Sequence, residues 1–418
     1  MIKYTPAKLS WEVLNDRMIA FIINWSMIQG LMSTIFNYHS VFNKIIMSRL
    51  YRAVFVVIVL YVIYTVFYKK VSRRALLLII FCFAVFAVSI GLNIRTLADD
   101  FSPIIRDYIF AILCFLAMTK ISSIVDFLEC LKKYIWLSSI YSIYAILYFQ
   151  IIYKYSMSFS YQIALPTIMA MLFLLKNRKY QYIPCIMINI FALLYCGSRG
   201  VFLCLVIAVL IYALKFCNSK KFVYITVGLT IIGLLYVGFG DVICPIIKNR
   251  FMYSRTYILL SQGRLFSFST RIPYYSNVLS AFKESPFSIH GFYADRVLLY
   301  NTMSPEQTLN ASVYGMYVHN FFLEILYQFG IWAVIILVLL IVNSFKAFRY
   351  SIKSEISSFI LLYIIFLSYA AGQLLVSSSY LSSPSFAIFI GFNIYVLDYM
   401  DKERNEKKHE SFIVAENY

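Results

Sequence analysis

The chain has 418 residues, of which 61% are hydrophobic and only 13% are charged, and its formal net charge is +18. This composition excludes an ordinary soluble globule, because most of the chain cannot form a polar surface. It predicts an integral membrane protein. The positive charge does not indicate nucleic acid, since Lys and Arg cluster between apolar runs and such clusters belong on the cytoplasmic side. The clusters lie at 69–74, 176–179, 218–221, 346–353 and 402–408.

Uncharged runs long enough to cross a hydrocarbon core of about 30 Å as a helix recur along the chain. They predict an all-α fold, a polytopic transmembrane bundle of about 12 helices (roughly 11 to 13) with both termini in the cytoplasm. No cleavable signal peptide is expected. The expected helices lie near 18–37, 53–68, 75–93, 104–119, 135–152, 161–176, 181–197, 200–215, 222–240, 318–345, 357–376 and 384–399.

The helices divide the chain into four expected parts. Residues 1–240 hold about nine transmembrane helices, 241–317 form a large extracytoplasmic loop, 318–400 hold about three more helices, and 401–418 are a charged cytoplasmic tail. Long loops without a domain of their own are usually functional. Apolar side chains at helical spacing between Tyr274 and Phe282 predict a short helix in this loop, either on the membrane surface or packed on the bundle.

The eight cysteines include no CxxC pair, and most of them stand inside apolar runs. This pattern favours small core residues over a disulfide framework or a zinc site. The sequence also lacks a convincing DxD, HExxH or Cys/His cluster. No metal site and no cofactor are therefore expected.

A turn at Gly197-Ser198-Arg199-Gly200 falls between two short apolar runs. Only 35 residues separate Lys179 from Lys215, whereas two full crossings need about 20 residues each. The turn is therefore expected at or below the outer rim of the membrane. A recessed arginine there has two interpretations. It faces a polar cavity or an anion, or it extends its guanidinium to the lipid headgroups. This turn alone does not decide between the two.

Arg271 stands at the expected start of the helix in the long loop. Ser269 or Thr270 is a candidate N-cap, and Pro273 suits the first turn. Exposed backbone N–H groups and the helix dipole both favour an anion at such a position. Two arginines suit a diphosphate, because a guanidinium binds phosphate oxygens in a bidentate manner. By itself, Arg271 is better interpreted as a solvated loop charge.

His319 begins the expected tenth span, on the same side as the long loop. Histidine is the side chain best suited to remove a proton near neutral pH, and a helix N-terminus favours its neutral, basic form. A lone histidine at this position is more often a structural hydrogen-bonding group. Glu324 lies about 140° further round the helix than His319, so it is not expected to orient the imidazole, and it is expected to be buried against a polar group of a neighbouring helix.

Three blocks together resemble the O-antigen ligase and polymerase superfamily, the multi-spanning glycan ligases and Wzy-type polymerases of bacterial envelopes. The first block is the Ser198-Arg199-Gly200 turn. The second and third blocks are Arg271, Tyr275, Pro286 and Gly291, followed by His319, Asn320, Leu323 and Gly330. The blocks occur in the family's order and flank one large outer loop. The chain departs from the family pattern at Tyr275, where tryptophan is usual, and at Ile289, where glycine is common.

The resemblance implies transfer of a glycan from undecaprenyl diphosphate, without a metal and with inversion at the anomeric carbon. Arg199 and Arg271, with Ser198, would bind the diphosphate, and His319 would deprotonate the acceptor hydroxyl. Asn320, Gly291 and Tyr275 would support this site. The protein would be a multi-pass protein of the bacterial cytoplasmic membrane, with its active site facing the periplasm or the cell exterior.

Four functions remain open from the sequence. The first is polymerisation of lipid-linked oligosaccharide repeats into O-antigen or capsular polysaccharide, and the departures at Tyr275 and Ile289 favour it. The second is ligation of the finished polymer onto lipid A-core. The third is a lipid-linked oligosaccharide flippase, which would be expected to show two comparable halves. The fourth is a structural scaffold. Expected partners are the lipid-linked donor, a glycan or lipid A-core acceptor, membrane lipids and a chain-length regulator, with no nucleic acid.

Overall fold

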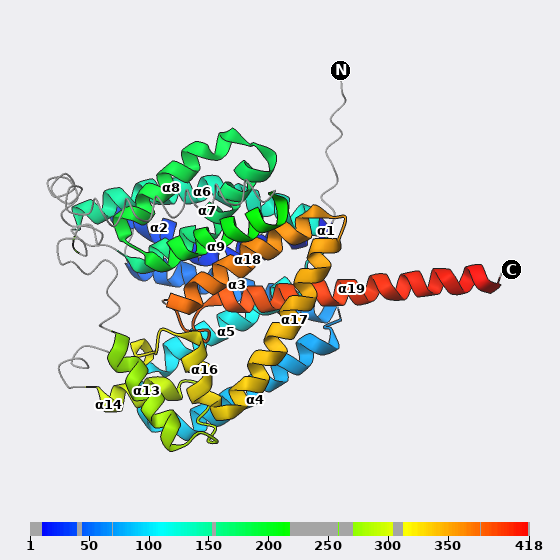
Figure 1. Ribbon diagram of the computed structural model, residues 1–418. Helices are drawn as coiled ribbons and strands as arrows, with labels where there is room; N and C mark the ends of the chain where they lie inside the picture. Colours follow the sequence, from blue (N-terminus) through cyan, green and yellow to red (C-terminus); the bar gives the residue numbers. More distant parts are fainter. Residues whose placement is uncertain are drawn as a thin grey trace.

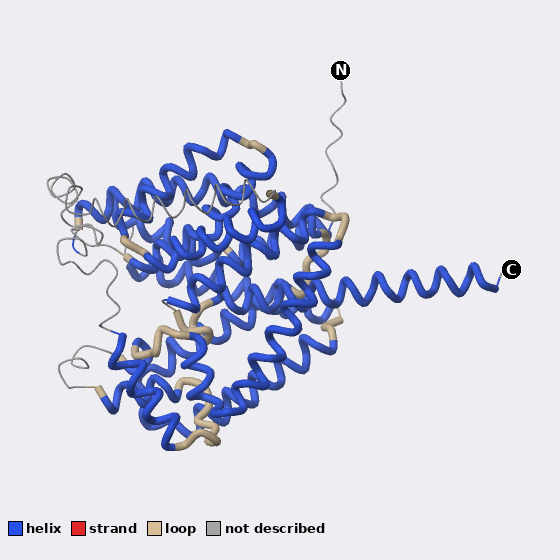
Figure 2. The backbone as a smooth tube through the Cα atoms, in the orientation of Figure 1, coloured by secondary structure: helices blue, strands red, loops and turns tan. Residues whose placement is uncertain are grey.

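The structure is a computed structural model that describes residues 11–39, 44–68, 70–152, 156–217, 258, 271–303, 312–376 and 378–416. Within these ranges the chain is helical, and none of the described residues lies in a β-strand (Figure 2). The predicted all-α fold is therefore confirmed.

Short connections join many of the consecutive helices, and a single residue, Asn24, separates the first two. The α-helices of the described residues are α1 (Trp11–Ile23), α2 (Trp25–His39), α3 (Lys44–Tyr68), α4 (Arg73–Leu97), α5 (Phe101–Met118), α6 (Ile124–Ile151), α7 (Met157–Asn177), α8 (Ile183–Cys196), α9 (Arg199–Phe216), α13 (Ile272–Glu284), α14 (Ala294–Thr302), α16 (Phe321–Phe329), α17 (Ala333–Lys353), α18 (Ser357–Val376) and α19 (Pro384–Glu416). The 3-10 turn η4 (Val313–Gly315) precedes α16.

Seven of the described helical stretches are long and apolar enough to cross a membrane. The bent pair α1 and α2, which meet at 61°, would make an eighth. The chain is thus a multi-pass membrane protein. The number of about 12 spans stays a prediction, because α8 and α9 are shorter, α19 is not among the seven, and the helix expected near 222–240 lies outside the described residues.

Several helices begin at a serine that satisfies a free backbone N–H group. The hydroxyl of Ser72 accepts a hydrogen bond from the N–H of Ala75 at the start of α4, and Ser123 accepts one from Asp126 at the start of α6. The first turn of a helix leaves its N–H groups without partners, and such caps are worth about 1 kcal/mol each. The local sequence therefore sets where these helices begin.

The helices form two regions that differ in content (Figure 1). The helical body, made of α1, α2, α5 to α9, α18 and α19, encloses the largest cluster of buried apolar side chains. The outer region comprises residues 271–303, 312–332 and 378–383, with α13, α14 and α16 at the end of the molecule opposite to the projecting part of α19 (Figure 1). Two smaller apolar clusters hold the outer region together and attach it to α4 and α5.

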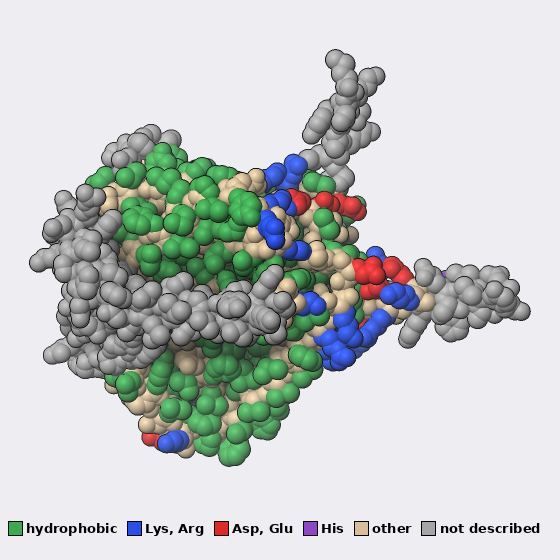
Figure 3. Space-filling model, turned by 45° about the horizontal axis from the view of Figure 1, so that its top comes forward, with side chains coloured by type: hydrophobic (Ala, Val, Ile, Leu, Met, Phe, Trp, Pro, Cys, Tyr) green, Lys and Arg blue, Asp and Glu red, His purple; other side chains and the backbone are tan. Residues whose placement is uncertain are grey.

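Charged side chains gather where α19 leaves the body (Figure 3). There Arg74 of α4 contacts Asp398 and Asp401 of α19, at 3.1 and 2.7 Å. Large apolar side chains of α3, α4 and α17, among them Leu60, Ile80 and Leu339, are exposed along the rest of the surface. Such a surface suits contact with lipid, and the charged end suits the cytoplasmic boundary.

Candidate functional site

Arg271 is the N-cap residue of α13, one position before the helix begins at Ile272. The proline expected in the first turn, Pro273, is there. Arg271 thus takes the N-cap position that was predicted for Ser269 or Thr270, and those two residues lie outside the described residues. The Arg271 guanidinium donates a hydrogen bond to the carbonyl of Val376, at the C-terminal end of α18. This carbonyl is the one hydrogen-bond partner of the guanidinium within the described part of the chain, so its other N–H groups remain available for an anion.

The helix predicted between Tyr274 and Phe282 is confirmed as α13, and it packs on α14 and α16. Val278 is fully buried, and Tyr274 and Tyr275 pack against the same apolar cluster. Leu279, expected on that face, is 39% exposed. The apolar face therefore serves mainly to attach α13 to the rest of the outer region, which is the second of the two expected arrangements.

The sequence predicted His319 at the start of a helix, but it lies in a short connection between the 3-10 turn η4 and α16, which begins at Phe321. Its backbone φ is +57°, a left-handed conformation that histidine adopts more readily than most side chains. Two contacts fix the start of this connection: the N–H of Tyr314 donates to Asp100 at 2.9 Å, and the Tyr314 hydroxyl donates to Asp107. Both carboxylates stand at the outer end of α5 or just before it, so the body positions the segment that carries His319.

Two tyrosines join His319 to the start of α13. The Tyr317 ring lies 4.0 Å from the imidazole, measured between centroids, and the Tyr274 ring meets it edge-on at 6.3 Å. Burial raises the pKa of Tyr317, while the positive charges of Arg296 and Arg271 act to lower it. Arg271 therefore lies within electrostatic reach of the ring that contacts His319. Two residues from different blocks of the sequence are thus gathered in one place.

Asn320 and Glu324 have structural tasks. Asn320 caps α16, where its side-chain oxygen accepts hydrogen bonds from the N–H groups of Phe322 and Leu323 at 3.0 and 3.2 Å. Glu324 is fully buried and accepts a hydrogen bond from the hydroxyl of Ser379, in the connection between α18 and α19. Glu324 is thus a buried acid with a polar partner, as expected, but this partner lies in a connection and not on a neighbouring helix.

Two glycines of the motif blocks allow close approaches between loops. At Gly330, where φ is +60°, a Cβ atom would lie 2.6 Å from the carbonyl oxygen of Pro286. The N–H of Ile331 donates to the same oxygen at 2.8 Å. At Gly291, where φ is +82°, a Cβ atom would collide with the hydroxyl of Ser89 on α4. The second and third blocks therefore fit against each other, and the second block fits against α4.

The Ser198-Arg199 turn opens α9, with Ser198 as the N-cap residue and Gly197 in a left-handed conformation at φ +59°. The Ser198 hydroxyl is buried and has no partner among the described residues. The side chain of Arg199 lies outside what the structure describes. Its meeting with Arg271 therefore stays a prediction.

Sequence reasoning missed Arg296, which is fully buried in the outer region. Its guanidinium carbon lies 4.7 Å from the ring centroids of both Tyr293 and Tyr314, and 5.5 Å from that of Tyr317. One N–H donates to the carbonyl of Tyr314, while Nε and Nη2 have no hydrogen-bond partner within the described residues. Tyrosines at 293, 314 and 317 flank an arginine in the sequence, but nothing in their spacing predicts this arrangement.

Two buried carboxylates accompany this arginine. Asp295 accepts a hydrogen bond from the Gln328 amide at 2.7 Å, and Gln328 in turn accepts one from the Tyr380 hydroxyl. Burial raises the pKa of Asp295, and Arg296 and the Gln328 amide offset this only in part. Asp295, Glu324 and Arg296 influence one another electrostatically. A polar network thus holds α14, α16 and the 378–383 connection together next to Tyr317.

The cysteines behave as expected in the described part of the chain. All seven there are free thiols, and five of them are buried. The eighth, Cys244, lies outside the described residues. No group of three or more His, Cys, Asp or Glu side chains is placed to bind a metal ion in the described ranges.

The arrangement of the site can be compared with known proteins. Residues 184–338 match the family model described as O-antigen ligase. This segment runs from the start of α8 to the first part of α17, so it contains all three motif blocks and the α13, α14 and α16 helices of the outer region. The predicted resemblance to the O-antigen ligase and polymerase superfamily is confirmed. No curated protein and no solved structure matches the chain.

His319 is partly exposed and lies beside two tyrosine rings, and the partly exposed Arg271 stands at the first turn of a helix. The helix N-terminus adds the partial positive charge of its N–H groups. This geometry can bind an anionic leaving group and accept a proton nearby.

Proposed function

We propose that the chain is an integral membrane glycosyltransferase that polymerises undecaprenyl-diphosphate-linked oligosaccharide repeats into O-antigen or capsular polysaccharide, at the outer face of the cytoplasmic membrane and without a metal. One observation carries the proposal. Arg271 and His319 come from different blocks of the O-antigen ligase segment, yet both lie around Tyr274 and Tyr317.

The reaction follows from the chemistry of these groups. A nitrogen of the His319 imidazole accepts the proton of an acceptor hydroxyl, and the hydroxyl oxygen attacks C1 of the donor sugar. The bond between C1 and the diphosphate oxygen breaks, and the undecaprenyl diphosphate leaves with the electron pair. Arg271 and the first turn of α13 stabilise the charge on this leaving group. Attack from the opposite face inverts the configuration at C1.

Arg199 completes the anion site in this proposal. The helices α9 and α18 pack along each other, and a Cβ atom at Gly372 would lie 2.6 Å from the backbone nitrogen of Cys204. The expected topology has α9 and α18 crossing in opposite directions. The start of α9 lies about one turn before Cys204, and the end of α18 lies about one turn after Gly372. In this topology the two ends are neighbours, and Val376 at the end of α18 accepts the hydrogen bond of Arg271. Both arginines would therefore reach one diphosphate.

A second candidate function is ligation of finished polymer from undecaprenyl diphosphate onto lipid A-core. The description of the matching family favours it. Both functions use the same donor and the same residues, and only the acceptor differs. Both functions need the site to face away from the cytoplasm. The charged side chains near α19, at the opposite end of the molecule, support this orientation, because such clusters belong on the cytoplasmic side.

Substitution of the two central residues tests the chemistry. We expect His319→Ala to lower transfer by about 10²- to 10⁴-fold, the contribution that a positioned base usually makes. Arg271→Lys is also expected to lower it, because an ammonium group cannot replace the bidentate guanidinium. Transfer is measured with purified protein and a lipid-linked repeat, with His409→Ala and Arg404→Ala on the exposed part of α19 as matched controls. Wild-type rates in either site variant would remove that residue from the mechanism.

A deletion strain separates the two functions. The surface glycan is separated by length on a gel, and the lipid-linked pool is extracted alongside. Single repeats on the final acceptor indicate a lost polymerase, whereas long polymer retained on the undecaprenyl carrier indicates a lost ligase. Repeats trapped on the cytoplasmic face would contradict both functions and indicate a flippase.

A further inference from the structure

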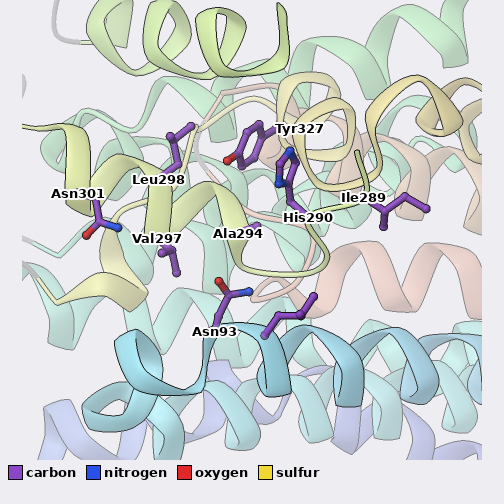
Figure 4. Close-up of a pocket in the computed structure, with 9 residues that line it drawn as sticks. Asn93, Ile289, His290, Ala294, Val297, Leu298, Asn301 and Tyr327 are labelled. Atoms are coloured by element: carbon purple, nitrogen blue, oxygen red, sulfur yellow. The ribbon is translucent and has the colours of Figure 1, made fainter. Parts of the chain in front are cut away.

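A cavity of about 350 Å³ opens between the outer end of α4 and the helix α14. Figure 4 shows Asn93 on one side of it, His290 and Tyr327 together on another, and Val297, Leu298 and Asn301 along α14. Its volume is within the range of ligand pockets, about 300–1,000 Å³. Neither His319 nor the two arginines proposed to bind the diphosphate line it.

The lining of this cavity combines uncharged polar groups with apolar surface, and it includes no Lys, Arg, Asp or Glu among the described residues. The Asn93 amide donates one hydrogen bond to the carbonyl of Ser89 at 3.0 Å, which leaves its oxygen and a second N–H for a ligand. Asn301 presents a second carboxamide. Val297 and Leu298 supply the apolar wall. Such a lining matches a ligand with several hydroxyl groups and C–H faces, but it does not match a diphosphate.

His290 is held in place at the cavity wall. Its ring stacks on Tyr327 with centroids 4.6 Å apart and planes 8° apart, and its Nε2 lies 3.3 Å from the Ser285 hydroxyl. Burial lowers the pKa of His290. The ring is therefore mainly neutral at neutral pH, with one nitrogen as a donor and the other as an acceptor.

The cavity and His319 share one apolar cluster as a common wall. Tyr327 and Ala294 line the cavity, and they belong to the same cluster as Val318, the residue before His319, and Tyr274, the ring that meets the imidazole. A ligand in the cavity would thus be separated from the segment that carries His319 by this apolar cluster. This is the position in which a remote part of a substrate provides binding energy for the transfer step.

We propose that this cavity is a subsite for an uncharged sugar residue of the glycan, held apart from the glycosidic bond that is being made. The proposal rests on the proposed function, because it assigns a part of the same substrate to the cavity. The amides and the imidazole exchange hydrogen bonds with the sugar hydroxyls. The C–H face of the ring packs on Val297 and Leu298.

Binding of a carrier-free glycan tests the subsite. The full chain is placed in lipid nanodiscs and titrated with the strain's own repeat-unit oligosaccharide, released from its lipid carrier. We expect Asn93→Ala and Asn301→Ala each to raise Kd by about 3- to 10-fold, which corresponds to the loss of one hydrogen bond. Val297→Phe, which fills the cavity, should remove measurable binding. Asn277→Ala is the matched control, since its amide bonds Thr302 at 3.1 Å outside the cavity.

Transfer kinetics with the same variants separate this proposal from the proposed function. If the wild type transfers glycan and the asparagine variants raise KM with little change in kcat, both proposals are supported. If the wild type transfers glycan while Kd and KM stay unchanged in Asn93→Ala, Asn301→Ala and Val297→Phe, the subsite is wrong and the function stands. If the wild type binds the oligosaccharide in an Asn93-dependent way but transfers nothing, the function is wrong and the saccharide site stands.

Discussion

Two groups of buried charge occupy opposite regions of the molecule, and they differ in how well they are satisfied. Asp16 of α1 is fully buried in the body, and its two oxygens accept hydrogen bonds from the N–H groups of Ser122 and Ser123 at 2.7 and 2.9 Å. In the outer region, Asp295, Arg296 and Glu324 are also fully buried. Each of these three has side-chain atoms without a partner among the described residues.

The difference distinguishes a charge that stabilises the fold from charges that are retained for function. Asp16 attaches α1 to the start of α6, and each of its oxygens replaces hydration with a backbone N–H. Arg296 and its two carboxylates give up hydration without full replacement, which costs free energy of folding. These incompletely satisfied charges lie next to Tyr317, whose ring contacts His319. Perturbed and incompletely satisfied charges of this kind concentrate at functional sites.

The largest effect is expected from Arg296→Met. Removal of the guanidinium leaves Asp295 and Glu324 buried without a positive partner, which typically costs about 3–5 kcal/mol. Transfer should fall as well, because Tyr317 loses the cation near its ring. Thermal unfolding in detergent measures the first effect, and Arg349→Met on an exposed position of α17 is the control. Equal loss in the two variants would show that the buried charge has no special role.

A smaller effect, on stability alone, is expected from Asp16→Asn. In the variant, the amide NH₂ group replaces one of the two oxygens that accept hydrogen bonds from backbone N–H groups. One buried N–H donor then loses its acceptor, at a cost of about 1–3 kcal/mol. The kcat of the folded protein should stay at the wild-type value. Asp126→Asn, on an exposed position of α6, is the matched control. A large loss of kcat in Asp16→Asn would contradict the division between the two regions.

The smallest effect is a pH dependence that originates in Asp295. Burial raises its folded-state pKa above the unfolded value of about 3.9, so the folded state binds the proton more tightly. Its contribution to stability is complete below about pH 4 and is lost as pH rises through the folded pKa. Asp295→Asn cannot ionise, so its melting temperature relative to wild type should increase as pH is raised. Parallel curves for the two proteins would contradict this assignment.

The sequence predicted those parts of the site that depend on local signals. Pro273 marked the start of α13, because the first turn of a helix favours proline, whereas α16 begins at Phe321, three residues after the predicted start near 318. The prediction that Glu324 does not orient His319 agrees with the structure, although His319 lies before α16 and the helical spacing therefore does not apply to it. Such local signals depend on neighbours within one or two turns.

The rest depends on contacts between distant segments. Arg296 looks like an ordinary loop cation in the sequence, and only the folding of η4 and α14 together places three tyrosine rings around it. Leu279 fits the apolar pattern of α13 but remains exposed, because α14 and α16 cover a narrower face than the pattern indicates. The hydrophobic pattern predicts which face of a helix is buried, whereas the packing of the neighbouring helices decides how wide the buried face is.

The contact between Gly291 and Ser89 limits how related chains can diverge. The N–H of Phe292 donates to the Ser89 hydroxyl at 2.7 Å, and no room is left there for a side chain at position 291. A related chain with a larger residue at position 89 would lose this hydrogen bond and push the loop outward. Positions 89 and 291 should therefore vary as a pair during evolution, although about 200 residues of sequence separate them.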